Sequence, residues 1–177
     1  MDTARFELVS KFADQTDLLP KRSTKFSAGY DFFVAEDIVV PSYQKIFKGL
    51  NFTEDEPLSL GFVSGLTSSY KCRPTLVPTG VKAYLPEGTY LQLAVRSSCP
   101  LKHWLILGNG VGIVDCDYYN NPDNEGHIFF MIMNLFPQDI LLHRGDRIGQ
   151  GIILPYCLAE GDNTTAARVG GYGSTGA

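Results

Sequence analysis

The chain has 177 residues, of which 44% are hydrophobic, and a formal net charge of −4 at pH 7. This length predicts a single domain, 1–177, that buries about 70% of its unfolded surface. An acidic chain is a poor candidate for non-specific nucleic-acid binding, which usually requires a basic patch. We therefore expect one globular domain with no nucleic-acid partner, whose local basic groups can still meet a small anion.

The cysteines and the apolar runs exclude several further classes. No C-x-x-C pair occurs, which argues against a zinc site, and four cysteines are few for a disulfide framework in a chain of this length. The N-terminus lacks the apolar stretch of a signal peptide, and the longest apolar run, 128–136, is too short to span a membrane. We expect a cytoplasmic protein with reduced thiols and no membrane partner.

Short β-type runs follow one another along the chain between turn residues. Ten prolines and eighteen glycines are spread along the sequence and leave little room for long helices. The expected strands lie within 5–10, 32–40, 75–85, 89–95, 103–107, 111–115, 127–136, 139–143 and 147–154. So many short strands predict an all-β sandwich or barrel.

Residues 44–74 interrupt this pattern because they lack a clear alternation of polar and apolar residues. We predict an insertion here, with one short helix. No shift in composition marks a second domain.

The stretch KFSAGYDFFVAED, 25–37, places a glycine beside Tyr30 and Asp31 and leads into an apolar strand. On these residues alone, Asp31 is expected to make local hydrogen bonds in a turn.

The stretch AVRSSCP, 94–100, ends an apolar strand in a cation and two hydroxyls, Arg96, Ser97 and Ser98. An arginine with adjacent hydroxyls and backbone N–H groups suits a phosphate. The alternative is a short helix with Ser98 as its N-cap and Pro100 near its start. The two interpretations are compatible, since a helix N-terminus also attracts anions.

The stretch GNGVGIVDCDYYNNPDNEG, 108–126, combines a glycine-rich turn, a short apolar run and several acids. Asp115 and Asp117 share a face if the strand stays extended. An EF-hand loop is excluded, because Tyr119 and Asn120 stand where it needs an Asp or Asn and then a Gly. Two interpretations remain: a hairpin whose acids lie in solvent, or a carboxylate that orients a water molecule.

The last two stretches are a turn and a glycine-rich terminus. HRGDRIGQGIIL, 143–154, is typical of a turn that leads into a strand. In AARVGGYGSTGA, the G-x-G-x-x-G spacing imitates a dinucleotide-binding turn, but no chain remains to form the helix that such a site needs. A mobile terminus is the default. The alternative is a segment that wraps a phosphorylated ligand with Arg, Tyr, Ser and Thr side chains.

Five of these stretches, AGYDFFVAED, RSS, GIVDCDYY, GDRIGQ and RVGGYGSTG, occur in the order of the five motifs of the trimeric dUTP diphosphatases (dUTPases). The chain resembles this family from about residue 28 to its end, apart from 44–74, and LVPTGVKAYLPEGTYLQL adds to the likeness. The resemblance implies a jelly-roll β fold, a homotrimer and Mg²⁺-dependent hydrolysis of dUTP to dUMP and pyrophosphate. It also implies shared sites at subunit interfaces, each closed by a C-terminal arm, here 168–177.

The resemblance also assigns roles to residues at matching motif positions. Asp115 is expected to activate the water that attacks the α-phosphorus, and Asp31 to contact Mg²⁺ through a water molecule. Tyr118 is expected to pack on the deoxyribose and exclude a 2′-hydroxyl. The groups expected to contact the phosphates are Arg96, Ser97, Ser98 and Gln150. The uracil is expected to meet Asn109, Gly112, Ile113 and Val114, and the arm to contribute Arg168, Tyr172, Gly173, Ser174 and Thr175.

Two alternatives share this fold. A dCTP deaminase needs a glutamate on the strand after the hairpin, but no acid lies between His127 and Asn134. A nucleotide-sensing or regulatory protein-binding module is the second, and Asp115 argues that catalysis has been retained. A regulatory partner that binds the 44–74 insertion is compatible with either activity.

Overall fold

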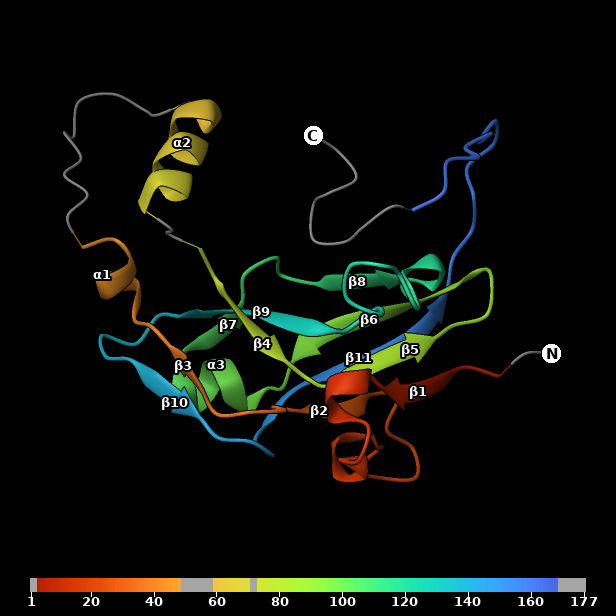
Figure 1. Ribbon diagram of the computed structural model, residues 1–177, viewed down its shortest axis with the longest axis horizontal. Helices are drawn as coiled ribbons and strands as arrows, with labels where there is room; N and C mark the ends of the chain where they lie inside the picture. Colours follow the sequence, from red (N-terminus) through yellow and green to blue (C-terminus); the bar gives the residue numbers. More distant parts are fainter. Residues whose placement is uncertain (1–2, 49–58, 71–72, 169–177) are drawn as a thin grey trace.

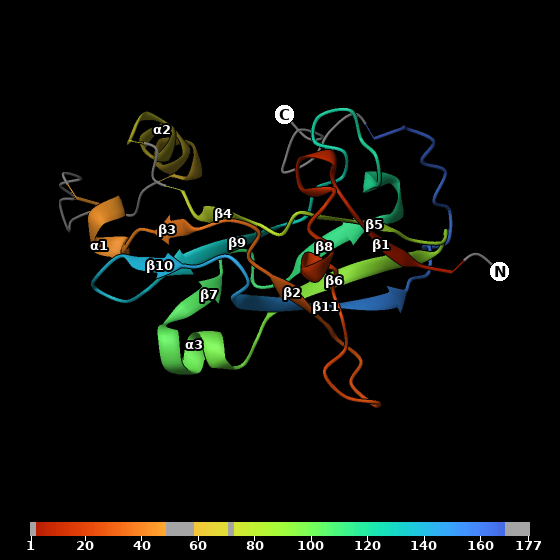
Figure 2. The ribbon, with the colours of Figure 1, turned by 60° about the horizontal axis from the view of Figure 1, so that its bottom comes forward.

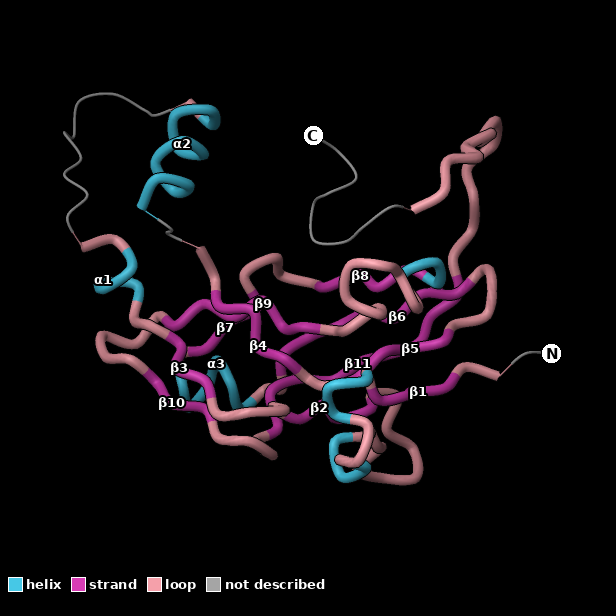
Figure 3. The backbone as a smooth tube through the Cα atoms, in the orientation of Figure 1, coloured by secondary structure: helices cyan, strands magenta, loops and turns pink. Residues whose placement is uncertain are grey.

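The computed structural model describes residues 3–48, 59–70 and 73–168, and shows a chain built mainly from short β-strands (Figures 1 and 3). The largest sheet has the antiparallel order β2 (Tyr30–Phe33), β11 (Arg147–Pro155), β6 (Thr89–Val95) and β8 (Gly112–Asp115). A second sheet has the order β4 (Thr75–Pro78), β9 (Phe129–Asn134) and β7 (Leu105–Leu107). Two strand pairs accompany them: β1 (Arg5–Leu8) with β5 (Val81–Tyr84), and β3 (Ile38–Val40) with β10 (Ile140–Leu142).

The core lies between the two larger sheets, which face each other as the layers of a sandwich (Figure 2). The ring of Phe32 on β2 lies 5.7 Å, centroid to centroid, from that of Phe130 on β9. Phe130 also covers Gly149 on β11 so closely that a Cβ there would lie 2.0 Å from the ring. Along β6, Leu91 and Leu93 are buried while the intervening residue is half-buried, as period-2 alternation requires. The predicted all-β sandwich is confirmed.

The structure corrects several predicted element bounds. The run 32–40 is interrupted after Phe33, where the N–H of Val34 bonds to the carbonyl of Asp146 instead of to a neighbouring strand. The run 75–85 is divided at Gly80, which adopts a φ of +73°. The helix after Arg96 exists, as α3 (Ser98–His103), but its N-cap is Ser97, one residue earlier than predicted.

Short helices occupy the ends and connections. Three are 3-10 turns: η1 (Ser10–Phe12), η2 (Thr16–Leu18) and η3 (Cys116–Tyr118). The interval 44–74 was predicted to hold one short helix, whereas the described residues include α1 (Tyr43–Ile46) and α2 (Leu60–Tyr70). Figures 1 and 2 place both beside the β3–β10 end of the sandwich. Within the described ranges, no helix combines the length and apolarity needed to cross a membrane.

Candidate active site

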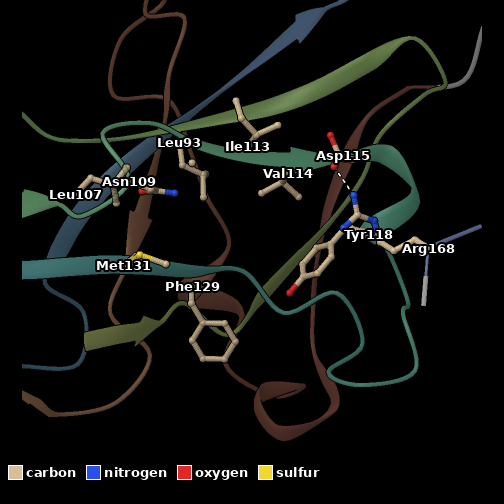
Figure 4. Close-up of a pocket in the computed structure, with 11 residues that line it drawn as sticks. Leu93, Leu107, Asn109, Ile113, Val114, Asp115, Tyr118, Phe129, Met131 and Arg168 are labelled. Carbon is tan, nitrogen blue, oxygen red and sulfur yellow. Dashed lines mark hydrogen bonds and ion pairs between the residues drawn. The ribbon is translucent and has the colours of Figure 1, made fainter. Parts of the chain in front are cut away.

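A cavity of about 450 Å³ opens between β8 and the outward face of β9 (Figure 4). We call it the β8 pocket. Seven residues singled out from the sequence line it: Asn109, Gly112, Ile113, Val114, Asp115, Tyr118 and Arg168. Four further lining residues were not predicted: Leu93, Leu107, Phe129 and Met131. The walls of the pocket are therefore mostly apolar, with the charged groups gathered at one end.

The turn before β8 brings backbone groups to the pocket wall. Gly110 takes a φ of +70°, which favours glycine, and lets the chain reverse before β8. Gly112 packs against Leu93 on β6, where a Cβ would lie 3.0 Å from the leucine Cβ. Since β8 ends the order of its sheet in the described part of the chain, its outer edge presents N–H and C=O groups to a ligand.

Asp115 and Arg168 form the charged end of the β8 pocket, and Asp117, which does not line it, holds Arg168 from behind. Asp115 is the last residue of β8, and the chain then turns into η3, so the strand does not stay extended through Asp117. Both acids nevertheless bind Arg168: its Nε donates to Asp117 at 2.7 Å, and its Nη2 donates to Asp115. The hydrogen bond to Asp117, ahead of charge attraction, raises the pKa of Arg168. The Asp115 side chain is 50% exposed and so remains accessible from solvent.

The Tyr118 ring forms a buried wall of the same pocket (Figure 4). The Arg168 guanidinium carbon lies 5.9 Å from its ring centroid, within reach of a cation–π contact. At its far end, the Tyr118 hydroxyl donates to the carbonyl of His127 at 3.1 Å. The ring thus presents an apolar face to the cavity while its polar group points into the protein.

A second group of predicted residues gathers where β2 and β11 pair. Gln150 lies opposite Asp31 in the register, and the absence of a side chain at Gly29 leaves room for the Gln150 amide, since a Cβ there would lie 2.6 Å from Oε1. Asp31 is buried, with its carboxylate 3.4 Å from Arg96 Nε and 3.5 Å from Arg147 Nη1.

Ser23 completes this group, because its hydroxyl donates to Asp31 at 2.6 Å. We call these residues the Asp31 cluster: Ser23, Asp31, Arg96, Arg147 and Gln150. A neighbouring hollow of about 330 Å³ is lined by Arg96, Arg147 and Ser98, among others. Ser97 is exposed at the start of α3. The cluster therefore adjoins a space that offers cations and a hydroxyl.

The two groups lie at opposite ends of β6. Asp115 pairs with Tyr90 at the start of the strand, whereas Arg96 follows its last residue, Val95. Six residues of extended chain separate the two ends by roughly 20 Å. One copy of the described chain therefore does not bring Asp115 to Arg96.

Two pocket residues that were not predicted, Phe129 and Met131, carry a signal in the sequence. In FFMIMN, the inward positions Phe130 and Ile132 are buried, yet the alternate positions Phe129 and Met131 are also apolar. A strand that is apolar on both faces predicts a second covered surface, here the wall of the β8 pocket. Arg147 was visible only as the first residue of a strand, and nothing in the sequence paired it with Asp31.

Comparison with known proteins gives a family. The dUTPase family model matches residues 66–176. A deoxyuridine 5′-triphosphate nucleotidohydrolase of Lactococcus lactis subsp. lactis (strain IL1403) is 38% identical over 174 residues, which cover 97% of each chain. The chain belongs to the dUTPase family.

Solved dUTPases share its fold. The crystal structure of the Streptococcus mutans dUTPase is 39% identical, with a TM-score of 0.69, and the match covers 89% of this chain and 99% of that one. A dUTPase from phage phi11 of S. aureus, 20% identical with a TM-score of 0.60, is alike in fold; the match covers 93% of this chain and 97% of that one. The predicted dUTPase-like β fold is confirmed. The predicted arm residues Tyr172, Gly173, Ser174 and Thr175 lie outside the described residues.

Proposed function

We propose that the chain carries out the reaction of its family, the hydrolysis of dUTP to dUMP and pyrophosphate, and that the β8 pocket receives the deoxyuridine. One observation carries this proposal. The seven described residues assigned to the base, the sugar, the attacking water and the arm all line a single cavity, although they are spread from Asn109 to Arg168 in the sequence. A cavity of about 450 Å³ lies within the usual range for small-molecule sites.

The pocket chemistry suits uracil on a deoxyribose. The backbone edge of β8 can match the hydrogen-bonding groups of uracil, whereas cytosine would set donor against donor at the 4-position. A site built for one pattern leaves buried groups unpaired with the other base, which strongly disfavours binding. The buried Tyr118 ring suits the apolar face of the sugar and leaves no partner for a 2′-hydroxyl.

Asp115 is the group that activates water in this proposal. Its carboxylate stands at the polar end of the β8 pocket and is half-exposed, so a water molecule can reach it. A carboxylate there can accept a proton from the water while the water oxygen attacks the α-phosphorus. Pyrophosphate then leaves with the electrons of the broken P–O bond. Arg168 would exchange its contact with Asp115 for the terminal phosphate when the substrate binds.

The phosphate contacts require a second copy of the chain. Arg96, Ser98 and Gln150 suit phosphate oxygens, but Arg96 lies roughly 20 Å from Asp115 along β6, and Gln150, which pairs with Ala94, lies roughly 13 Å away. We infer that the Asp31 cluster of one copy faces the β8 pocket of another, within a homotrimer that places three such sites at its interfaces. A cyclic trimer repeats one interface three times, so each chain contributes both halves.

The donor set fits magnesium held mainly by the substrate. No group of three or more potential metal ligands is found among the described residues, so a cage made of protein atoms alone is absent there. Mg²⁺ commonly keeps several waters and binds phosphates with one or two carboxylates. Asp31 Oδ1 lies 3.4 Å from Arg96, too long for a strong hydrogen bond, and can accept one from a metal-bound water. When bound, the ion would neutralise charge on the triphosphate.

The test is an assay of the purified chain with Mg²⁺ and each deoxynucleoside triphosphate in turn. Both pyrophosphate and ammonia are measured. We expect pyrophosphate from dUTP and background amounts from the other nucleotides. Ammonia from dCTP would contradict the proposal in favour of a deaminase, and binding of dUTP without either product would favour a nucleotide-sensing module.

A further inference from the structure

The loop 119–126, which connects η3 to the residues before β9, is closed around Tyr118 by asparagine side chains. Asn121 is 6% exposed. Its amide donates to the carbonyl of Tyr118 at 3.0 Å and to Asn124 Oδ1 at 2.8 Å, and its Oδ1 accepts the N–H of Asp123 at 3.1 Å. The loop is thus organised from within and held against the backbone of Tyr118.

Asn124 links this loop to the hydroxyl of Tyr118. Its Nδ2 donates to the Tyr118 hydroxyl at 2.8 Å, and its Oδ1 accepts the N–H of Gly126 at 3.0 Å. The same hydroxyl donates to the carbonyl of His127 at 3.1 Å. Tyr118 is therefore fixed both at its backbone and at the far end of its side chain.

The loop has little freedom to move away. Gly126 has a φ of +80°, and a Cβ there would lie 2.7 Å from the carbonyl oxygen of Tyr118. From outside, the Glu125 carboxylate accepts the hydroxyl of Ser10 at 2.8 Å, and Asn120 Oδ1 accepts from Lys82 at 2.7 Å. Asn124 is held by a loop that is itself anchored to the sandwich.

We propose that Asn124 is a positioning residue for sugar selectivity. By tethering the Tyr118 hydroxyl, it holds the ring at the depth in the β8 pocket that admits a 2′-hydrogen and excludes a 2′-hydroxyl. The inference rests on the proposed role of Tyr118 against the deoxyribose. Exclusion of one oxygen atom requires a rigid wall, because a ring that can shift gives way to the larger ligand. The two hydrogen bonds at the hydroxyl supply this rigidity.

The test compares kcat/KM for dUTP and UTP, measured as pyrophosphate release, in Asn124→Ala, Tyr118→Phe and the double variant. We expect Asn124→Ala to lower the dUTP/UTP ratio about tenfold, the scale of one hydrogen bond, and Tyr118→Phe to lower it at least as much, because it also removes the bond to His127. The double variant should match Tyr118→Phe, because that change already removes the bond that Asn124 makes to the hydroxyl. Asn120→Gly is the matched control: it removes a neighbouring asparagine that faces Lys82, suits the left-handed backbone there, and should leave the ratio unchanged.

A further variant, Tyr118→Ala, distinguishes the inference about Asn124 from the proposed role of Tyr118 against the deoxyribose. If Tyr118→Ala lowers the ratio but Asn124→Ala slows both nucleotides equally, the inference is overturned while the role of Tyr118 stands. If Tyr118→Ala itself leaves the ratio unchanged, both are overturned. Should Asn124→Ala fail to fold, Tyr118→Phe still removes the bond from Asn124, together with the one to His127, and an unchanged ratio then overturns the inference.

Discussion

The β8 pocket and the Asp31 cluster differ in what surrounds their charged groups. The β8 pocket is a cavity with mostly apolar walls, in which one end carries Asp115 and Arg168. The Asp31 cluster is a set of polar side chains that contact one another, with a buried carboxylate between two arginines. In the proposed function, the first receives the base and the sugar, and the second offers cations to the phosphates. The length of β6 keeps the two apart within one chain.

The largest expected effect is the loss of the carboxylate in the β8 pocket. Asp115→Asn keeps the shape of the side chain but cannot accept the proton from water. We predict that kcat falls roughly a thousandfold, within the range for a general base, while the Kd for dUTP, measured calorimetrically, changes little. Asp117→Asn is the control, since it removes a charge two residues away that also holds Arg168. A loss of binding as large as the loss of rate would contradict the water-activating role.

Acid should lower the stability of the fold through the buried His127, which lies next to the β8 pocket in sequence but does not line it. Burial lowers the pKa of His127 to about 4, while the unfolded chain takes up a proton at about 6.5. The contribution of His127 to the free energy of unfolding is therefore complete above pH 6.5, and about 3 kcal/mol is lost as the pH drops towards 4. Urea unfolding across this range should show the loss in the wild type but not in His127→Gln, which can still accept the Gly80 N–H. His143→Gln, at an exposed histidine, should retain the wild-type acid slope.

Removal of Arg96, one of the two cations in the Asp31 cluster, should weaken binding of the substrate phosphates. Arg96→Ala removes charge-assisted hydrogen bonds to the substrate and leaves Asp31 with less compensation. We predict that kcat/KM for dUTP falls roughly thirtyfold, or about 2 kcal/mol. Arg5→Ala, at an exposed arginine paired with Glu7, is the control and should keep full activity. Wild-type kcat/KM in Arg96→Ala would place phosphate binding elsewhere.

The smallest effect is expected at Ser23, which touches Asp31 but not the proposed substrate. Ser23→Ala removes a 2.6 Å hydrogen bond to the carboxylate. Steady-state assays at several Mg²⁺ concentrations should show a loss of about fivefold in kcat/KM. Ser27→Ala, whose hydroxyl bonds within the same loop to Thr24, is the control. Equal effects from both serines would indicate a general loosening of the loop rather than a specific role at Asp31.

Much of the fold was predictable because its signals are local. The run 89–95 forms β6 with the predicted bounds, and the residues around Gly110 form a turn that leads into β8. The predicted hairpin is wrong, because β7 pairs with β9 whereas β8 pairs with β6. The break between Phe33 and Ile38 was not predictable, because the N–H of Val34 finds its partner in Asp146, more than a hundred residues away.

The sites divide in the same way. Ordered motifs predicted seven residues that line the β8 pocket, since the turn at Gly110, β8 and η3 bring Asn109 and Tyr118 to one cavity over a short stretch. The contribution of Phe129, the pairing of Arg147 with Asp31 and the tether from Asn124 depend on packing between distant or irregular segments. Sequence patterns report which residues alternate, but they do not report which carboxylate a given arginine meets.

The central claim is that a working site combines the β8 pocket of one chain with the Asp31 cluster of another. The most direct test is to co-refold equal amounts of Asp115→Asn and Arg96→Ala, each impaired alone, and to assay dUTP hydrolysis. Random mixing should restore about a quarter of the sites to wild-type composition, and activity should rise accordingly above that of either variant. If the mixture shows only the average activity of the two variants, Asp115 and Arg96 act within the same chain and the shared-site account is wrong.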